Sequence, residues 1–445
     1  MATSISEVAR SRIPGFSPAQ NNIADSDRVG HDWYRFVLSF PPHLVRKYLE
    51  KFDLLPGRTV LDPFCGTGTT VLECKKLSIN SLGVEAHPMA HFATAVKLDW
   101  TPDPDALLEH ASAVRRLAHR KLQRDGISDD VNSSRPNKAL RQLPSDLEKL
   151  LLTDSISPLP LHKSLVLLDA IEQLRDARFV GHERLALAKV LVGEISNLRF
   201  GPEVGLGSIK KDSPVIEPWF GQMETVGSDL VKLHELSGAH AEVFSGDSRL
   251  LSFLPKRRRV DAVITSPPYP NEKDYTRTTR LESVLLGFVS GKVSLRGLKK
   301  TLIRSNTRGV YKPDDDDRWV SSHARINDIA EEIEARRIAL NKDSGFERLY
   351  ARVTRLYFGG MARHFSALRK MLSPGARLAY VVGDQASYLR ILIRTGQLLG
   401  EIAESLGYEV EALELFRTRL STATKEQLRE EVLLLRWPGL GKGRG

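Results

Sequence analysis

The segment Thr265-Ser266-Pro267-Pro268-Tyr269 places a hydroxyl, two prolines and an aromatic ring directly after an apolar run. That run, residues 260–264, is typical of a buried strand. Neither proline can donate a hydrogen bond to a sheet ladder, so the strand must end before them. We therefore expect a rigid, extended loop at the carboxyl end of a strand, where open α/β sheets bind ligands. Such a loop suits the binding of a small planar group.

A second loop, residues 62–70 (DPFCGTGTT), joins an expected strand at 59–64 to an expected helix at 69–77. Gly66 and Gly68 permit a tight turn and a close approach of ligand to backbone at a helix N-terminus. Glu85 ends the next expected strand, nineteen positions after Gly66, where an acid is placed to accept both hydroxyls of a ribose. The pattern indicates an adenosine-containing cofactor. A dinucleotide is disfavoured because the third glycine of GxGxxG is absent, and a Walker loop because no Gly-Lys-Ser/Thr follows.

With both motifs, the chain resembles the amino-methylating DNA methyltransferases, which use S-adenosylmethionine to methylate cytosine N4 or adenine N6. DPFxGxGTT is that family's cofactor motif and SPPY its catalytic motif. Segments 39–41, 197–203, 245–248 and 271–277 are also similar to family sequences. The resemblance implies that Phe40 covers the methionine end of the cofactor and that Asp247 meets its adenine amino group. The cofactor-binding residues it implies are Phe40, Asp62, Phe64, Cys65, Gly66, Gly68, Thr69, Thr70, Glu85, Asp247 and Thr265.

The catalytic motif has the groups that methylation of an exocyclic amino nitrogen requires. The lone pair of such a nitrogen is delocalised into the ring, and two acceptors that take its hydrogens can free it. Ser266 Oγ and the Pro267 carbonyl are candidate acceptors, Pro268 stiffens the turn, and Tyr269 offers a face for stacking on the base, worth ~1–3 kcal/mol. The base must leave the duplex, so base flipping is implied. Methylation at cytosine C5 is excluded, because neither Cys65 nor Cys74 lies in a catalytic Pro-Cys context.

The order of expected strands and helices predicts how these loops are positioned. Strand, helix, strand and helix follow one another from residue 59 to 98, which predicts a parallel sheet with right-handed crossovers. Further strands are expected at 241–244, 260–264, 377–382, 408–416 and 431–437, the last two as an antiparallel edge hairpin. We therefore predict an α/β, Rossmann-like S-adenosylmethionine methyltransferase fold, with a seven-stranded, mostly parallel sheet and an antiparallel edge strand.

Four kinds of segment are expected along the chain. Residues 1–30 are expected to form a flexible arm, and residues 31–100, 240–289 and 345–440 a discontinuous catalytic domain. Residues 101–239 are leucine-rich at helical spacing and predict a mostly helical insertion, a candidate for target recognition. Residues 290–344 predict a loop-rich insertion and a candidate DNA contact. Many family members are circularly permuted, with the catalytic motif first, whereas here the cofactor motif comes first.

Basic residues near the catalytic motif are candidate DNA contacts. Residues 291–312 hold lysines and arginines and no acid, which suits a phosphate-contacting loop or, equally, a solvated loop that balances Asp314–Asp317. That acidic run is expected to be flexible and solvated. Arg277 and Arg280 suit phosphate or pairing with Glu272 and Glu282, the run 256–259 suits a surface turn, and His87 a structural role. The candidate DNA-binding residues are Asn271, Arg277, Arg280, Lys299, Lys300, Arg304 and Arg308.

Whole-chain composition agrees with a soluble globular protein, and its charge favours a polyanionic partner without distinguishing DNA from RNA. The 445 residues carry a formal net charge of +10. Two cysteines indicate neither a disulfide framework nor a thiolate metal site, and no metal site is expected from the spacing of other ligand types. No apolar run is long enough to cross a membrane and no signal peptide is evident, so we expect a cytoplasmic protein that does not bind membranes.

The function that fits best is a site-specific methyltransferase acting on cytosine N4 of double-stranded DNA, because a serine opens the catalytic motif. Adenine N6 as the target, an RNA amino methyltransferase, and a non-catalytic DNA-binding protein with a relic cofactor fold are the alternatives. The usual Asp or Asn at the start of the RNA enzymes' motif is absent, and the intact motif residues argue against decay. A cognate restriction endonuclease is a further candidate partner. Neither that partner nor the oligomeric state is determined by the sequence.

Overall fold

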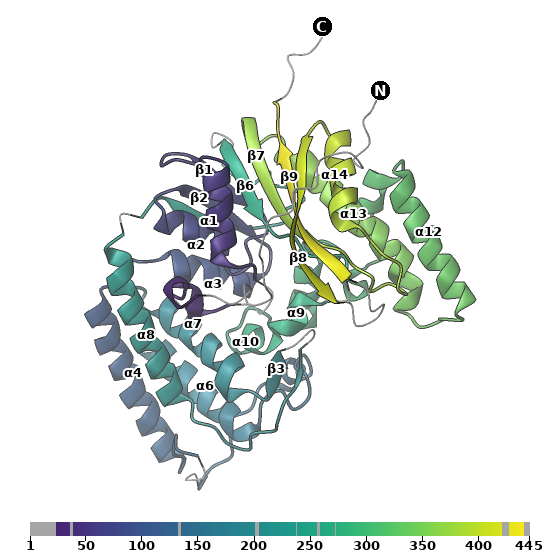
Figure 1. The fold of residues 1–445 in the computed structure, drawn as a ribbon. Coiled ribbons are helices and arrows are strands. Elements are labelled where there is room, and N and C mark those ends of the chain that lie inside the picture. The colour runs from purple at the N-terminus through teal and green to yellow at the C-terminus, as the bar shows by residue number, and fades with distance from the viewer. Residues whose placement is uncertain are drawn as a thin grey trace.

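The computed structural model describes residues 24–35, 39–131, 135–200, 204–236, 238–255, 259–271, 273–420 and 427–439. Most of the predicted N-terminal arm, Glu272, and the segments 201–203 and 256–258 lie outside the described residues. The fold is a single large sheet with helices on both faces and a helical lobe below it (Figure 1). None of the described helices is long and apolar enough to span a membrane.

The central sheet has seven strands in the order β5-β2-β1-β6-β7-β9-β8. The first five in this order are parallel, and β9 is antiparallel to both of its neighbours. The order reverses between β1 and β6, which creates the crevice where such sheets bind ligands. The bounds of the strands are β1 Thr59–Asp62, β2 Asn80–Glu85, β5 Ala241–Ser245, β6 Val260–Thr265, β7 Leu372–Gly383, β8 Glu409–Leu420 and β9 Gln427–Arg436.

The predicted hairpin at the end of the chain is present, and it differs from the prediction in one respect. The antiparallel strand, β9, lies one place inside the edge, and β8 is the edge strand. This follows from the pairing, because β9 returns along β8 and at the same time pairs with β7. In this register Glu430 of β9 lies between Gly383 of β7 and Arg417 of β8.

Alternate residues of the strands form the cores on the two faces of the sheet. Val60, Ile264 and Val381 pack under α1, and the intervening Leu61 and Val263 pack under α13. Figure 1 shows α1 and α2 on one side of the sheet and α13 and α14 on the other. The helices next to the sheet are α1 Pro42–Lys51, α2 Thr69–Lys76, α3 Pro88–Leu98, α13 Tyr350–Leu368 and α14 Thr395–Ser405.

The first insertion is mostly helical, as predicted, with a small two-stranded hairpin. Its core is continuous with residues of the sheet domain, since Trp33, Leu72 and Met89 belong to the same buried cluster as Trp219. The elements of this lobe are α4 Pro104–Arg124, α5 Ser145–Glu148, α6 Pro158–Gln173, α7 Val180–Val190 with a π-helical turn Leu191–Ile195, β3 Leu198–Phe200, β4 Val204–Leu206 and α8 Ile216–His234.

Residues 25–33 belong to the packed structure, although the sequence assigned residues up to 30 to a loose arm. Asp229 of α8 accepts hydrogen bonds from Gly30 N and Trp33 Nε1, each at 2.9 Å. Asp27 is buried and pairs with Arg46 of α1 at 2.9 Å. The start of the described chain is thus tied to both the sheet domain and the helical lobe.

The segment 290–344 is helical, contrary to the prediction of a loop-rich insertion. Its main elements are α11 Lys292–Thr301, a 3-10 turn Asp316–Val320 and α12 Ala324–Ala339, preceded by the short helices α9 Tyr275–Thr278 and α10 Arg280–Leu285. Val320, Ile326 and Ile333 join the core over α13. Apolar residues in this stretch therefore have a partner, which the sequence pattern did not indicate.

The acidic run Asp314–Asp317 is not the solvated loop that we predicted. Asp314 accepts two hydrogen bonds from Arg304, both at 2.8 Å, and Asp316 pairs with Arg249 at 2.6 Å. Gly359 of α13 lets the chain pass closely, since a Cβ there would lie 1.9 Å from the Asp316 carbonyl oxygen. Asp314 therefore forms an ion pair within the second insertion, and Asp316 links the insertion to Arg249 after β5 and, at 3.0 Å, to Arg363 of α13.

Candidate active site

The two predicted loops meet where β1 and β6 end side by side. Thr265 Oγ1 donates a hydrogen bond to Asp62 Oδ1 at 2.5 Å, and Phe64 N donates to the same oxygen at 3.1 Å. Thr70 Oγ1 adds a second link to the Ile264 carbonyl at 3.1 Å. Asp62 is fully buried, and this burial raises the pKa of its carboxyl to about 6. The glycine loop and the catalytic loop are therefore fastened together at their bases.

The glycine loop has the backbone geometry that its residue types predict. Gly66 and Gly68 have φ angles of 54° and 86°, a region in which side chains are strained. Thr94 Oγ1 donates to the Gly66 carbonyl at 2.9 Å, and the buried ammonium of Lys97 donates to the Thr67 carbonyl at 3.0 Å. A Cβ at Gly66 would meet nothing within 4 Å. The loop is held from below by α3 and leaves its upper surface open.

Glu85 lies at the predicted place beside the glycine loop. Its two carboxyl oxygens accept hydrogen bonds from Gly66 N at 2.8 Å and from His87 N at 2.7 Å. Burial raises the pKa of this carboxyl to about 7 even though both hydrogen bonds favour the charged form. Each oxygen keeps a lone pair that can accept from a ligand hydroxyl. The fixed carboxylate thus suits a ribose.

His87 follows Glu85 and is best described as a neutral structural link. It is buried, and burial lowers the pKa of its imidazole to about 4. Its Nε2 lies 2.9 Å from Thr279 Oγ1. This contact joins the cofactor side of the site to the chain that follows the catalytic motif, in agreement with the structural role expected from the sequence.

Asp247 also lines the site, but its carboxylate is already engaged. Arg249 contacts both oxygens, with Nε to Oδ1 at 2.9 Å and Nη2 to Oδ2 at 2.6 Å. The same guanidinium reaches Asp316 of the second insertion at 2.6 Å. Asp247 can still accept one hydrogen bond from a ligand through its remaining lone pairs. The sequence did not indicate that Asp316, 69 positions after Asp247 in the chain, binds the same arginine.

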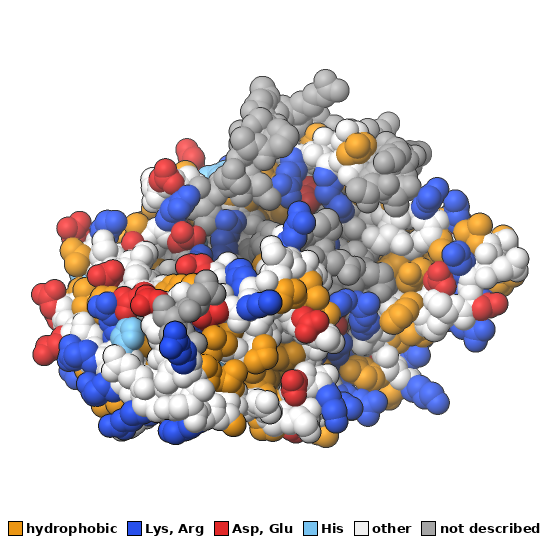
Figure 2. All heavy atoms as spheres, turned by 90° about the horizontal axis from the view of Figure 1, so that it is seen from below, with side chains coloured by type: hydrophobic (Ala, Val, Ile, Leu, Met, Phe, Trp, Pro, Cys, Tyr) orange, Lys and Arg blue, Asp and Glu red, His pale blue; other side chains and the backbone are white. Residues whose placement is uncertain are grey.

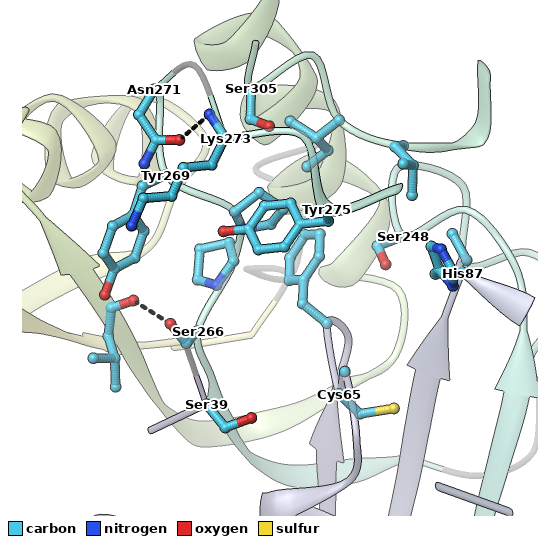
Figure 3. Close-up of a pocket in the computed structure, with 18 of the residues that line it drawn as sticks. Ser39, Cys65, His87, Ser248, Ser266, Tyr269, Asn271, Lys273, Tyr275 and Ser305 are labelled. Atoms are coloured by element: carbon cyan, nitrogen blue, oxygen red, sulfur yellow. Dashed lines mark hydrogen bonds between the residues drawn. The ribbon is translucent and has the colours of Figure 1, made fainter. Parts of the chain in front are cut away.

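The catalytic loop holds its serine as an acceptor. Ser266 Oγ donates its hydrogen to the Val381 carbonyl at 3.1 Å, so only its lone pairs are left for a ligand. The ring of Tyr269 lies against Gly383 of β7, where a Cβ would be 2.9 Å from Tyr269 Cε2. Figure 3 shows Ser266, Tyr269 and Tyr275 around one hollow, with Ser39 and Cys65 on the side of the glycine loop.

One cavity of about 580 Å³ joins the two loops. The predicted residues that line it are Phe40, Phe64, Cys65, Gly66, Thr69, Glu85, Asp247, Ser266, Pro267, Pro268, Tyr269, Asn271 and Lys299. Asp62, Gly68, Thr70 and Thr265 lie beneath the wall and hold the loops instead of lining the cavity. The cavity is large enough to hold a nucleoside-sized cofactor and a second planar group.

The cysteine of the glycine loop lines this cavity without being reactive. Cys65 is buried, and burial raises the pKa of its thiol well above the ordinary value. Cys74 is likewise buried with a raised pKa. Neither thiol is a ready thiolate, which agrees with the exclusion of a cysteine nucleophile from sequence. No group of three His, Cys, Asp or Glu side chains that could hold a metal occurs in the described part of the chain.

Several residues of the cavity wall were not predicted. Tyr275 lies in the segment that resembled family sequences, and this resemblance could have identified it. Lys273 and Asp274 lie in the same segment, whereas the other missed residues named below come from segments without a motif, the second insertion and the β8–β9 hairpin. The wall residues that we missed include Lys273, Asp274, Ser305, Asn306, Phe416, Arg417, Arg419 and Glu430.

The structure separates the candidate DNA contacts into free and engaged residues. Arg304 is buried on Asp314, and Lys299 pairs with the buried Asp274 at 2.7 Å, so neither is a free phosphate ligand. Arg280 donates to the carbonyls of Thr276 at 2.8 Å and Leu150 at 3.3 Å instead of pairing with Glu282. The sequence grouped these cations by proximity alone, and tertiary contacts then gave some of them buried partners.

The remaining candidate contacts stay accessible to different degrees. Arg277 is half-buried, and Lys300 and Arg308 are exposed. Asn271 is buried at the cavity wall, where its Oδ1 accepts from Lys273 N at 2.9 Å (Figure 3). Asn271 is therefore a wall residue, and Lys300 and Arg308 are surface residues.

Comparisons with known proteins define the class. The family model described as DNA methylase matches residues 18–95, which include the glycine loop and Glu85. Together with the relatives below, this match supports an amino-methyltransferase of the N4/N6 family, for which S-adenosylmethionine is the implied methyl donor.

Relatives of this class match along most of the chain. The type II methyltransferase M.BsoBI of Geobacillus stearothermophilus is 26% identical over 87% of this chain and 80% of its own length. M.AvaI of Nostoc sp. is 23% identical over 93% of this chain and 88% of its own length. Among solved structures, the rRNA methyltransferase AviRa of Streptomyces viridochromogenes covers 93% of this chain and 94% of its own, at 11% identity and a TM-score of 0.32, which is too low to bear on function.

The cavity fits S-adenosylmethionine. Glu85 offers fixed acceptors for ribose hydroxyls, the open surface above Gly66 admits a ligand, and Phe40 and Phe64 supply apolar wall. The bound cofactor supplies an electrophilic methyl group. The site residues then have to orient an amino nitrogen toward that group and exclude water, which is a task of positioning.

The contact between Tyr269 and Gly383 leads to a first prediction. Replacing Gly383 by Ala places a methyl group where the Tyr269 ring lies, so the ring must move. We expect Gly383→Ala to lower the rate of methyl transfer by at least about tenfold, with S-adenosylmethionine affinity unchanged in calorimetry. Gly400→Ala in α14 is the matched control, because its Cβ makes an ordinary contact of 3.6 Å. Equal rates for the two variants would contradict the positioning of Tyr269 by Gly383.

Proposed function

We propose that the protein transfers a methyl group from S-adenosylmethionine to N4 of a flipped-out cytosine in double-stranded DNA. The observation that carries the proposal is the state of Ser266, which opens the SPPY motif and uses its only hydrogen on the Val381 carbonyl. Ser266 lines the cavity, so in this proposal its oxygen serves as an acceptor for the substrate. The type II DNA methyltransferases that match most of the chain support DNA as the substrate.

The catalytic loop orients the amino nitrogen in this proposal. Ser266 Oγ and the Pro267 carbonyl accept its two hydrogens, which favours a pyramidal nitrogen whose lone pair points toward the methyl group. Pro267 and Pro268 leave the loop little backbone freedom to lose. Tyr269 stacks on the base, and Gly383 fixes the position of its ring. Cys65, buried and protonated, takes no part as a nucleophile.

We further propose that the exposed face of α11 contacts the DNA backbone. Leu295, Leu298 and Leu302 face a small buried cluster, which turns Lys292, Arg296 and Lys300 outward. No ion pair with a carboxylate involves these three cations in the described part of the chain. The C-terminal end of α11 reaches the cavity wall through Lys299 and Thr301. Figure 2 shows Lys and Arg side chains in several groups on the face seen from below.

The target base can be identified by analysis of methylated DNA. Duplex DNA incubated with the protein and S-adenosylmethionine, then digested to nucleosides, is expected to contain N4-methylcytosine by mass spectrometry. Ser266→Ala, which lacks one acceptor, should form the product about tenfold more slowly while binding the cofactor normally. N6-methyladenine as the only product would overturn the assignment to cytosine. Methylation of total tRNA in preference to duplex DNA would overturn the choice of DNA.

Glu85 makes cofactor binding sensitive to pH. With a pKa of about 7 in the free protein, its carboxyl becomes protonated as the pH falls, whereas ribose hydroxyls need the charged form as acceptor. The dissociation constant for S-adenosylmethionine should therefore rise below pH 7, by up to about tenfold per pH unit. In Glu85→Gln, calorimetry should show weak binding without this pH dependence. A wild-type dissociation constant that stays flat from pH 8 to pH 5.5 would refute the role.

The exposed face of α11 can be tested through salt dependence. Replacing Lys292, Arg296 and Lys300 by Ala should reduce the slope of log K for duplex DNA against log salt by about 0.9 for each lost phosphate contact. The control replaces Arg116, Arg120 and Arg124 of α4, which have the same spacing and are also exposed. Equal loss of slope in the two triple variants would mean that only total charge matters, and would contradict a specific contact by α11.

A further inference from the structure

Two arginines and one glutamate of the β8–β9 hairpin lie beside the catalytic tyrosine, outside both motifs. Strand register places Gly383, Glu430 and Arg417 in one row across β7, β9 and β8. The Tyr269 ring occupies the space over Gly383, and the Glu430 side chain borders the same space, with Cγ 3.3 Å from a Cβ built at Gly383. Arg417, Arg419 and Glu430 line the same cavity as Ser266.

The charges in this group are unequal. Arg417 Nε donates to Glu430 Oε2 at 2.5 Å, while Arg419 Nε lies 3.8 Å from Oε1 of the same carboxylate, beyond hydrogen-bond distance. Arg419 Nη2 donates to the Asp384 carbonyl at 3.1 Å. The Nε of Arg419 is buried and has no hydrogen-bond partner among the described residues. One carboxylate therefore serves two guanidinium groups.

Neighbouring acids do not supply the missing charge. The carboxylate of Asp384 pairs with Arg394 at 2.7 Å, and Glu431 pairs with Arg429 at 2.9 Å. Among the described residues, Arg417 and Arg419 thus share Glu430, which leaves one unit of positive charge at the cavity wall. Their side chains are 31% and 39% exposed, so this charge reaches the opening of the cavity and not only its interior.

We propose that Arg417 and Arg419 bind the phosphodiester group attached to the target nucleotide, with Glu430 as the residue that positions both arginines. This inference rests on the proposed function, since it takes DNA as the substrate. A flipped base turns about its own backbone, so a base stacked on Tyr269 brings its phosphate to the mouth of the cavity. Guanidinium groups match phosphate oxygens in charge and geometry, and the exposed parts of both arginine side chains can meet a phosphate at the mouth of the cavity.

The test is a double-mutant cycle between protein and DNA. The duplex carries the site that sequencing of methylated DNA identifies, either with its natural phosphates or with a neutral methylphosphonate next to the target nucleotide, on the 5′ or the 3′ side. We expect Arg419→Ala to weaken binding of the natural duplex by about tenfold and one of the two methylphosphonates to weaken binding to the wild type similarly. Combining that methylphosphonate with Arg419→Ala should cause no further loss.

The control variant is Arg436→Ala, at the other end of β9, where the arginine pairs with the exposed Glu409. The loss of DNA-binding free energy caused by Arg436→Ala and the loss caused by the methylphosphonate should be additive. Calorimetry with S-adenosylmethionine should give the wild-type dissociation constant for Arg419→Ala, which shows that the cofactor site is intact.

The possible results distinguish this inference from the proposed function. If the loss of DNA binding caused by Arg419→Ala adds to the loss caused by each methylphosphonate, the arginines do not bind that phosphate. Arg419 would then contact the base or have a purely structural role. If Arg419→Ala has no effect on DNA binding, the inference is likewise refuted. Failure of the wild-type protein to methylate any duplex DNA would instead refute the proposed function, before the cycle is measured.

Discussion

The hydrogen bond between Thr265 and Asp62 joins the ends of two adjacent parallel strands, and the geometry of the site depends on it. One strand carries the glycine loop and the other the catalytic loop. Because both partners are buried and the strands are clamped between two cores, the loops cannot shift independently. A reaction that depends on bringing a methyl group and a nitrogen into line needs this kind of fixed relation.

Around this junction the cavity is completed by segments distant in sequence. The glycine loop and Glu85 form one end, and the second insertion and the β8–β9 hairpin form much of the other. Arg249 connects these parts, since it binds Asp247 at the end of the sheet and Asp316 of the insertion. The second insertion is therefore a structural part of the site, and a change in its packing on α13 would be felt at Asp247.

Local signals in the sequence predicted the parts of the site that depend on local geometry. The glycines of the cofactor loop, the prolines of the catalytic loop and the spacing to Glu85 each constrain a few neighbouring residues, and the structure has them as expected. Predictions about charges were less successful. Arg304 and Lys299 were predicted as candidate DNA contacts and the acidic run Asp314–Asp317 as a solvated loop, yet several of these residues form buried ion pairs.

By itself, the sequence determined the fold class through the order of its strands and helices, and its two motifs indicated the cofactor through their resemblance to a known family. It also placed two loops with special backbone requirements at the ends of strands, because those requirements involve only adjacent residues. Tertiary structure decided which charges are free and which are paired, and which segments complete the cavity. The partner of a charged side chain can lie anywhere in the chain, as Arg249 and Asp316 show. Sheet register alone brings Glu430 and Arg417 next to the space that Tyr269 fills, although the tyrosine lies far from both in sequence.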